Sequence, residues 1–188
     1  MTNPDPSPAS NYLESVRKLF RYYKKLGEGA MAQLSDADLH LLPAPFANSV
    51  SIIVKHLWGN MLSRWTDFLS SDGEKPWRER EAEFEGTLAT RAEIMQAWEE
   101  GWDRLFKAID PLAEEDVSRV IYIRNEGHTV LEALNRQLAH YAYHVGQIVF
   151  MAKQIRGKDF QSLSIPRGGS EAYNADKFRE DKGRRHFV

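Results

Sequence analysis

Two histidines one helical turn apart are the residues of this chain with the clearest capacity for chemistry. His140 and His144 lie in the run TVLEALNRQLAHYAYHVGQIVFMAKQIR, residues 129–156. In a helix, a spacing of four residues brings two Cβ atoms to roughly 6 Å from each other. Two imidazoles at that distance can bind one divalent metal ion through bonds of about 2.1 Å. Such a pair is also typical of partly buried histidines that hydrogen-bond to their neighbours, so a metal site requires a third ligand.

The run that carries this pair has the pattern of a long amphipathic helix. Thr129 and Glu132 have the spacing of an N-terminal capping box, and Gly157 is a plausible C-terminal stop. The zincin motif is excluded, because no glutamate base lies between the two histidines. Apolar residues recur at spacings of three and four, which predicts one buried helical face: Val130, Leu134, Leu138, Tyr141, Val145, Ile148 and Ala152.

The composition narrows the chemistry that the chain can perform. The 188 residues include no Cys, which excludes a thiol nucleophile, a disulfide framework and a thiolate metal site. Metal ligands must then be histidine, carboxylate, amide oxygen or water. The formal net charge of −2 gives no field that favours nucleic acid or an anionic membrane. No apolar run approaches the ~18 residues of a membrane helix, and the N-terminus has no signal-peptide pattern. We therefore expect a cytoplasmic protein with no nucleic-acid and no membrane partner.

Three further stretches have helical patterns, at residues 11–32, 50–70 and 90–108. Residues 71–89, between the last two stretches, are polar and turn-rich. A connection of this length is found where the chain crosses over between helices of a bundle instead of making a tight hairpin. We expect residues 1–9 to form a flexible leader, 10–174 the folded domain and 175–188 a mobile tail. Residues 120–123 could be a short extended segment, and the chain after residue 157 is predicted to be irregular. Four long amphipathic helices without a convincing sheet predict an all-α four-helix bundle.

His56 is the strongest candidate for a third ligand, because it lies within the predicted second helix. On a helical wheel it falls opposite the apolar arc, together with Asn60, Ser63 and Asp67. This polar face could simply be exposed to solvent, or it could line a site while the apolar face packs elsewhere. Helical periodicity alone favours the first alternative.

A resemblance to a known family favours the alternative in which the polar face of His56 lines a site. The chain resembles the DinB superfamily in the order of its histidines. One histidine lies early in the second helix and an HxxxH pair lies in the fourth, in a four-helix chain of this size without Cys. That bundle is also seen in YfiT-type metal hydrolases and bacterial thiol transferases. The resemblance covers roughly residues 10–174. Four runs are similar to one uncharacterised subfamily of this superfamily: IIVKHLWGNMLSRWTDFL, DGEKPWRERE, LEALNRQLAHYAYHVGQI and LSIPRGGSEAYN.

The resemblance implies a bundle of up-down-down-up order, with a long crossover between helices 2 and 3, that often forms a homodimer. It also implies that His56, His140 and His144 bind one divalent transition metal, with Zn, Ni, Co or Fe all compatible with nitrogen ligands. Three imidazoles leave a coordination position for water or for a small-molecule substrate. Such a site suits hydrolysis, or transfer of a low-molecular-weight thiol that the substrate must supply.

Five residues near the histidines are candidates for supporting the site or contacting substrate. Asn60 lies one turn after His56, and Gln137 and Tyr141 lie on the helix of the histidine pair; Arg136 and Gln147 lie on that helix as well. Packing, capping or exposure to solvent would explain each of them equally well. The catalytic residues themselves cannot be assigned from the sequence.

Three hypotheses follow for the function. The first is a metal-dependent enzyme of the hydrolase or thiol S-transferase type. The second is a binding module, in which a metal or another ligand stabilises the bundle without turnover. The third is a structural dimer in which the polar histidine face has no function. The first leads, because an open three-histidine site is chemically competent.

Overall fold

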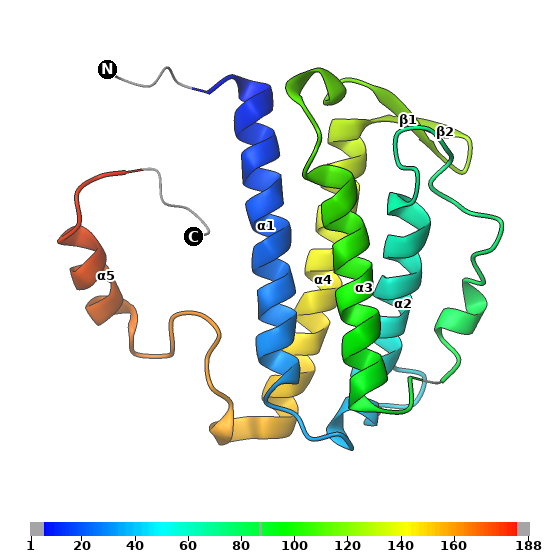
Figure 1. Ribbon diagram of the computed structural model, residues 1–188. Helices are drawn as coiled ribbons and strands as arrows, with labels where there is room; N and C mark the ends of the chain where they lie inside the picture. Colours follow the sequence, from blue (N-terminus) through cyan, green and yellow to red (C-terminus); the bar gives the residue numbers. More distant parts are fainter. Residues whose placement is uncertain (1–5, 87, 184–188) are drawn as a thin grey trace.

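The computed structural model describes residues 6–86 and 88–183, and this part of the chain is mostly helical (Figure 1). The prediction of a helical fold is confirmed. The α-helices of these residues are α1 (Pro8–Met31), α2 (Val50–Trp65), α3 (Arg91–Ile109), α4 (Val130–Arg156) and α5 (Ser170–Phe178). Two short strands, β1 (Val120–Ile123) and β2 (Glu126–Thr129), form an antiparallel hairpin. Short 3-10 turns are η1 (Asp38–His40), η2 (Glu81–Glu83), η3 (Glu114–Asp116) and η4 (Gly157–Asp159).

The helices α1 to α4 lie side by side as a bundle. In Figure 1, α1 and α4 run downward, whereas α2 and α3 both run upward and are joined by a long connection. The most extensive contacts are between α2 and α3 and between α1 and α4, while α2 also contacts α4. The contact between α2 and α4 brings together the two helices that carry the candidate ligands.

The helices begin where side chains can satisfy their first amide groups. Thr129 and Glu132 form the expected capping box at α4, and Thr90 and Glu93 form another at α3. In α1 the start differs from the predicted Asn11. Ser7 accepts a hydrogen bond from the amide of Ser10, and a proline begins the helix.

One aromatic ring from each bundle helix meets at the centre of the core. Phe20 of α1 lies 6.4 Å from Trp65 of α2, 6.4 Å from Trp102 of α3 and 6.0 Å from Tyr141 of α4, between ring centroids. All four residues are buried. Aromatic pairs at these distances add to the free energy gained from burial alone, so this cluster helps to fix the relative positions of the four helices.

The connection from residue 66 to residue 90 lies along the outer side of α2 (Figure 1). Lys55 of α2 holds this segment through hydrogen bonds from Nζ to the carbonyl oxygens of Ala82 and Glu85. The amide of Gly73 donates to the carbonyl of Tyr122 in β1, at 2.8 Å. The connection is therefore anchored at both ends, and it places η2 next to α2.

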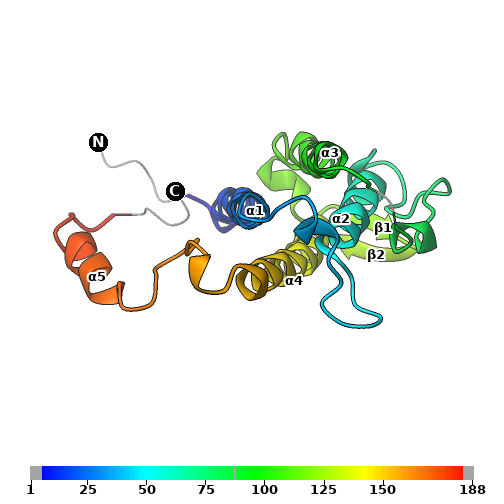
Figure 2. The same ribbon diagram turned by 90° about the horizontal axis from the view of Figure 1, so that it is seen from below.

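Two sequence predictions about local structure are wrong, and a third is confirmed only in part. The sequence predicts a second helix to about residue 70, but α2 ends at Trp65, because Thr66 adopts an extended conformation with ψ 124°; Asp67 follows with φ 49°. Residues 120–123 form the predicted extended segment as β1, but residues 126–129 pair with it as a second strand, which the sequence did not predict. Arg124 and Asn125 supply the turn with positive φ. The segment predicted to be irregular contains α5, which lies apart from the bundle (Figure 2) and buries no side chain.

The predicted leader (1–9) and tail (175–188) fall partly outside the described residues. Within those residues, Pro8 and Ala9 belong to α1, and residues 175–178 belong to α5.

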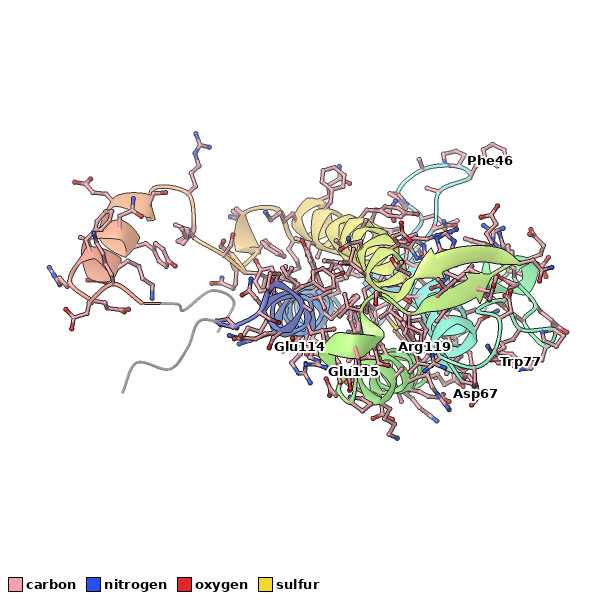
Figure 3. All side chains as sticks on the ribbon, turned by 90° about the horizontal axis from the view of Figure 1, so that it is seen from above. Phe46, Asp67, Trp77, Glu114, Glu115 and Arg119 are labelled. Carbon is pink, nitrogen blue, oxygen red and sulfur yellow. The ribbon has the colours of Figure 1, made fainter. Side chains whose placement is uncertain are left out.

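In the described part of the chain, none of the helices has both the length and the apolar character needed to cross a membrane. Figure 3 shows the side chains along the bundle, with Phe46 projecting outward from the loop before α2.

Candidate metal centre

The fold brings His56 of α2 together with His140 and His144 of α4. One ring nitrogen of each histidine lies within 4.8 Å of those of the other two. The two nearest, Nε2 of His56 and Nε2 of His140, are 3.3 Å apart. A tetrahedral ion with metal–nitrogen bonds of about 2.1 Å separates two ligands by about 3.4 Å. The three side chains therefore have the spacing that a shared ion requires.

His56 is oriented by a carboxylate from the connection between α2 and α3. Its Nδ1 lies 2.8 Å from Oε2 of Glu83, so Nδ1–H donates and Nε2 faces His140. Arg78 in turn holds Glu83 with two hydrogen bonds, from Nε at 2.7 Å and from Nη2 at 3.0 Å. A carboxylate behind a histidine is the usual outer partner of a metal ligand, because it fixes the tautomer and the ring orientation.

Glycine at position 59 makes this approach of Glu83 to α2 sterically allowed. A Cβ atom at Gly59 would lie 2.5 Å from Oε1 of Glu83, closer than two such atoms can approach. Since residue 59 lies three positions after His56, the same turn of α2 supplies both the imidazole and the space for its partner.

His144 has one nitrogen engaged and one without a partner. Its Nδ1 lies 2.8 Å from Oε1 of Gln147, so Nδ1–H donates to the amide oxygen. Its Nε2 is buried, and the described residues give it no hydrogen-bond partner. A buried polar atom without a partner is costly. A metal ion bound by the three imidazoles would satisfy this nitrogen, so the residues present fit such an ion.

The surroundings keep the α4 imidazoles neutral at pH 7. Burial, together with the nearby charges of His144 and His56, lowers the pKa of His140 to about 3. Burial, with the charge of His56, lowers the pKa of His144 to about 4. Burial alone would raise the pKa of Glu83, but hydrogen bonds from His56 and Arg78 outweigh it and lower the pKa. The site thus combines two neutral imidazoles on α4 with an ionised carboxylate, the protonation states that metal binding requires.

The histidines open onto a cavity of about 350 Å³. Two aromatic rings stand beside them: Phe84 stacks on His56 at 4.9 Å between centroids, and Tyr143 lies 4.0 Å from His144. Five arginines line the cavity, and no Asp or Glu is among its lining residues in the described part of the chain. Those arginines are Arg64, Arg78, Arg80, Arg124 and Arg136.

The other residues singled out from the sequence lie in different places. Asn60 and Gln137 are buried and line the cavity. Tyr141 instead points into the core, where its hydroxyl donates to Oδ1 of Asn60 at 2.9 Å and accepts from Nε1 of Trp65 at 3.0 Å. Tyr141 therefore joins α4 to α2 beside the histidines without lining the cavity.

Replacing Tyr141 by phenylalanine is expected to destabilise the fold. The variant leaves the indole N–H of Trp65 and the amide oxygen of Asn60 buried without their partner, which costs about 1–3 kcal/mol. Urea unfolding of Tyr141→Phe measures this loss. Tyr143→Phe is the matched control, because Tyr143 is half-exposed on the same helix and should unfold like the wild type. Equal midpoints for all three proteins would contradict the assigned role.

Sequence reasoning missed the residues that the connection between α2 and α3 contributes. Glu83, Arg78 and Phe84 belong to a polar segment without periodicity, and Glu83 is 27 residues from the histidine that it contacts. No spacing rule links two such positions. The signal available was the run DGEKPWRERE, which carried the family resemblance and contains Arg78 and Arg80.

A family model matches residues 7–169, and its family is described as a protein of unknown function, DUF1572. The chain belongs to this family. The DUF1572 match spans α1 to α4, the three histidines and every arginine of the cavity, and it ends immediately before α5. The searches of curated proteins and of solved structures found no match.

Proposed function

We propose that the chain is a metal-dependent enzyme that holds one divalent transition metal on His56, His140 and His144. One observation carries the proposal: three ring nitrogens from two helices converge within 4.8 Å, and the buried Nε2 of His144 has no other partner in the described residues. Zn, Ni or Fe would each suit three imidazole ligands. Three protein ligands leave a coordination position for substrate, as in catalytic rather than structural sites.

The resemblance to the DinB superfamily supports this proposal from a separate direction. In that superfamily, histidines at these positions are the metal ligands, on a bundle of up-down-down-up order. The homodimer and the cytoplasmic location that we expected from the sequence remain part of the proposal. The family match itself brings no reaction, since DUF1572 is described as of unknown function.

The reaction proposed is transfer of a low-molecular-weight thiol to an electrophilic substrate. Hydrolysis is the second candidate reaction for the same site. A bound divalent metal supplies Lewis acidity, which lowers the pKa of a thiol or water group. Around it, Glu83 orients His56, while the arginines of the cavity favour an anionic sulfur or oxygen atom. The chain contains no Cys, so the thiol must belong to a substrate. Among the described residues, the lining includes no carboxylate that could act as a general base, which favours thiol transfer over hydrolysis.

The alternative is a binding module that takes up metal or a small ligand without turnover. The same lack of a carboxylate among the described lining residues favours it, because the cavity offers few groups for proton transfer. The two functions differ in one measurable property, namely whether a substrate is consumed.

Turnover assays separate these functions. Purified protein, loaded with Zn²⁺, Ni²⁺ or Fe²⁺, would be incubated with a small thiol and an electrophile, and in parallel with activated esters and amides. We expect thiol consumption that stops on chelation and that is absent from His140→Ala. Metal uptake without turnover in any of these assays would favour the binding module.

A further inference from the structure

The charge of the histidine cavity points to the kind of molecule that it receives. Five arginines and three histidines line the cavity, while its described lining residues include no acidic side chain. Two carboxylates that contact this lining are not themselves among the lining residues. Glu83 is bound by Arg78 and His56, and Glu74 faces Arg64, Arg78 and Arg124 at 3.1–3.4 Å.

Two of these arginines have donor capacity that the protein leaves unused. Arg136 is exposed on α4, and in residues 6–86 and 88–183 its guanidinium has no carboxylate partner; its Nη1 lies 3.4 Å from His128. Arg124, in the turn of the hairpin, contacts Glu74 but has a side chain that is 52% exposed. Both residues line the cavity, so their guanidinium groups can turn toward a ligand bound there.

Two buried polar atoms of the cavity wall also lack hydrogen-bond partners within the part of the chain that the structure describes. Arg64 is 5% exposed, and its Nε has no hydrogen-bond partner in the described residues. Gln137 is 3% exposed, and its Oε1 is likewise without a partner there. Both residues line the cavity. Buried polar groups without hydrogen-bond partners reduce the stability of the fold unless a ligand or water satisfies them. These two groups therefore indicate that this wall of the cavity contacts a ligand or water.

We propose that the cavity binds a small oxyanionic substrate, whose carboxylate or phosphate group is held by Arg124 and Arg136 next to the three histidines. The proposal rests on the proposed function, since it assigns a substrate class to that site. Guanidinium groups match both oxyanions in shape and charge, through paired N–H donors. A volume of about 350 Å³ is at the small end of the range for small-molecule sites. Phe84 and Tyr143 would flank the apolar part of the ligand.

Calorimetric titration of metal-free protein tests the proposal with two probes, inorganic phosphate and succinate, at an ionic strength held constant with chloride. We expect saturable binding of at least one probe to the wild type. A loss of charge-assisted hydrogen bonds should raise Kd at least about tenfold in Arg136→Gln and in Arg124→Gln. The probe that binds more tightly distinguishes a carboxylate substrate from a phosphate substrate.

The control variant is Arg104→Gln, in which an exposed arginine of α3 outside the cavity lining is replaced. It should bind the probes as the wild type does, since screening by chloride removes long-range effects. Absence of saturable binding to the wild type, or equal Kd values for wild type and both cavity variants, would overturn the proposal. Because no metal is present in the titration, failure of the metal site leaves this result unaffected. Metal uptake without anion binding would overturn only the substrate class.

Discussion

Replacing His140 by alanine is expected to weaken transition-metal binding more than about 100-fold. Loss of an outer hydrogen-bond partner of a metal ligand already costs about 10–100-fold, and the variant removes a ligand itself. The nitrogen that is lost lies 3.3 Å from Nε2 of His56. The dissociation constant for Zn²⁺ can be measured by competition with a chromophoric chelator. His56→Ala, on the other helix, should show a loss of the same order.

His40→Ala is the matched control for both variants. This histidine is exposed in η1, away from the cavity lining, and its removal should leave the dissociation constant unchanged. Equal losses in His56→Ala and His140→Ala, with none in His40→Ala, would join α2 and α4 in one site. A loss in His140→Ala alone would indicate that the α4 pair binds metal without His56, contrary to the proposed site.

Replacing Glu83 by alanine is expected to have the largest effect on stability. Its side chain and that of Arg78 are 7% and 3% exposed, and they form two hydrogen bonds. Removing one partner of a buried ion pair leaves the other charge uncompensated, at a cost of about 3–5 kcal/mol. Glu74 remains 3.4 Å from Arg78, so we expect the lower end of that range. Urea unfolding of the metal-free proteins measures the difference.

A second substitution at this position separates stability from metal binding. Glu83→Gln keeps the volume and an acceptor for the N–H of His56, but it loses the charge that strengthens the imidazole as a ligand. Metal affinity should then fall about 10–100-fold. Glu81→Gln is the control, because Glu81 is exposed in the same turn with a side chain that is 87% accessible. Unchanged stability of Glu83→Ala together with unchanged metal affinity of Glu83→Gln would contradict the role given to Glu83.

The sequence predicts the metal helix well because its signals are local. Thr129 and Glu132 form the capping box that their spacing predicts, and α4 ends at Arg156, directly before the predicted stop at Gly157. His140 and His144 lie one turn apart because an α-helix has a fixed period. Each of these features depends on residues within a few positions, so no knowledge of the tertiary fold is needed.

The cavity around the histidines could not be predicted in this way. Its arginines come from α2, the 66–90 connection, the hairpin turn and α4, and along the sequence each has acidic residues nearby. Only the folded chain decides which charged groups line the cavity: the guanidinium groups do, whereas Glu74 and Glu83 contact them from outside the lining residues. The position of His56 was ambiguous for a related reason. A polar helix face looks the same in the sequence whether it meets solvent or a buried carboxylate.

The second strand of the hairpin and the helix α5 could not be predicted for a similar reason. The hairpin turns at Arg124 and Asn125 in positive-φ conformations, and the sequence has neither a glycine nor an Asn-Gly pair at these two positions to indicate a tight turn between two strands. The helix α5 is short and has no buried face, so it lacks the apolar periodicity by which the longer helices were recognised.

The central claim is that three histidines from two helices hold one metal ion, and elemental mass spectrometry tests it most directly. The protein would be produced without a histidine tag, purified without a metal column and compared with His56→Ala and His140→Ala. We expect about one transition-metal ion per chain in the wild type and none in either variant. A wild type that carries no transition metal, even after incubation with Zn²⁺ or Ni²⁺, would contradict the claim.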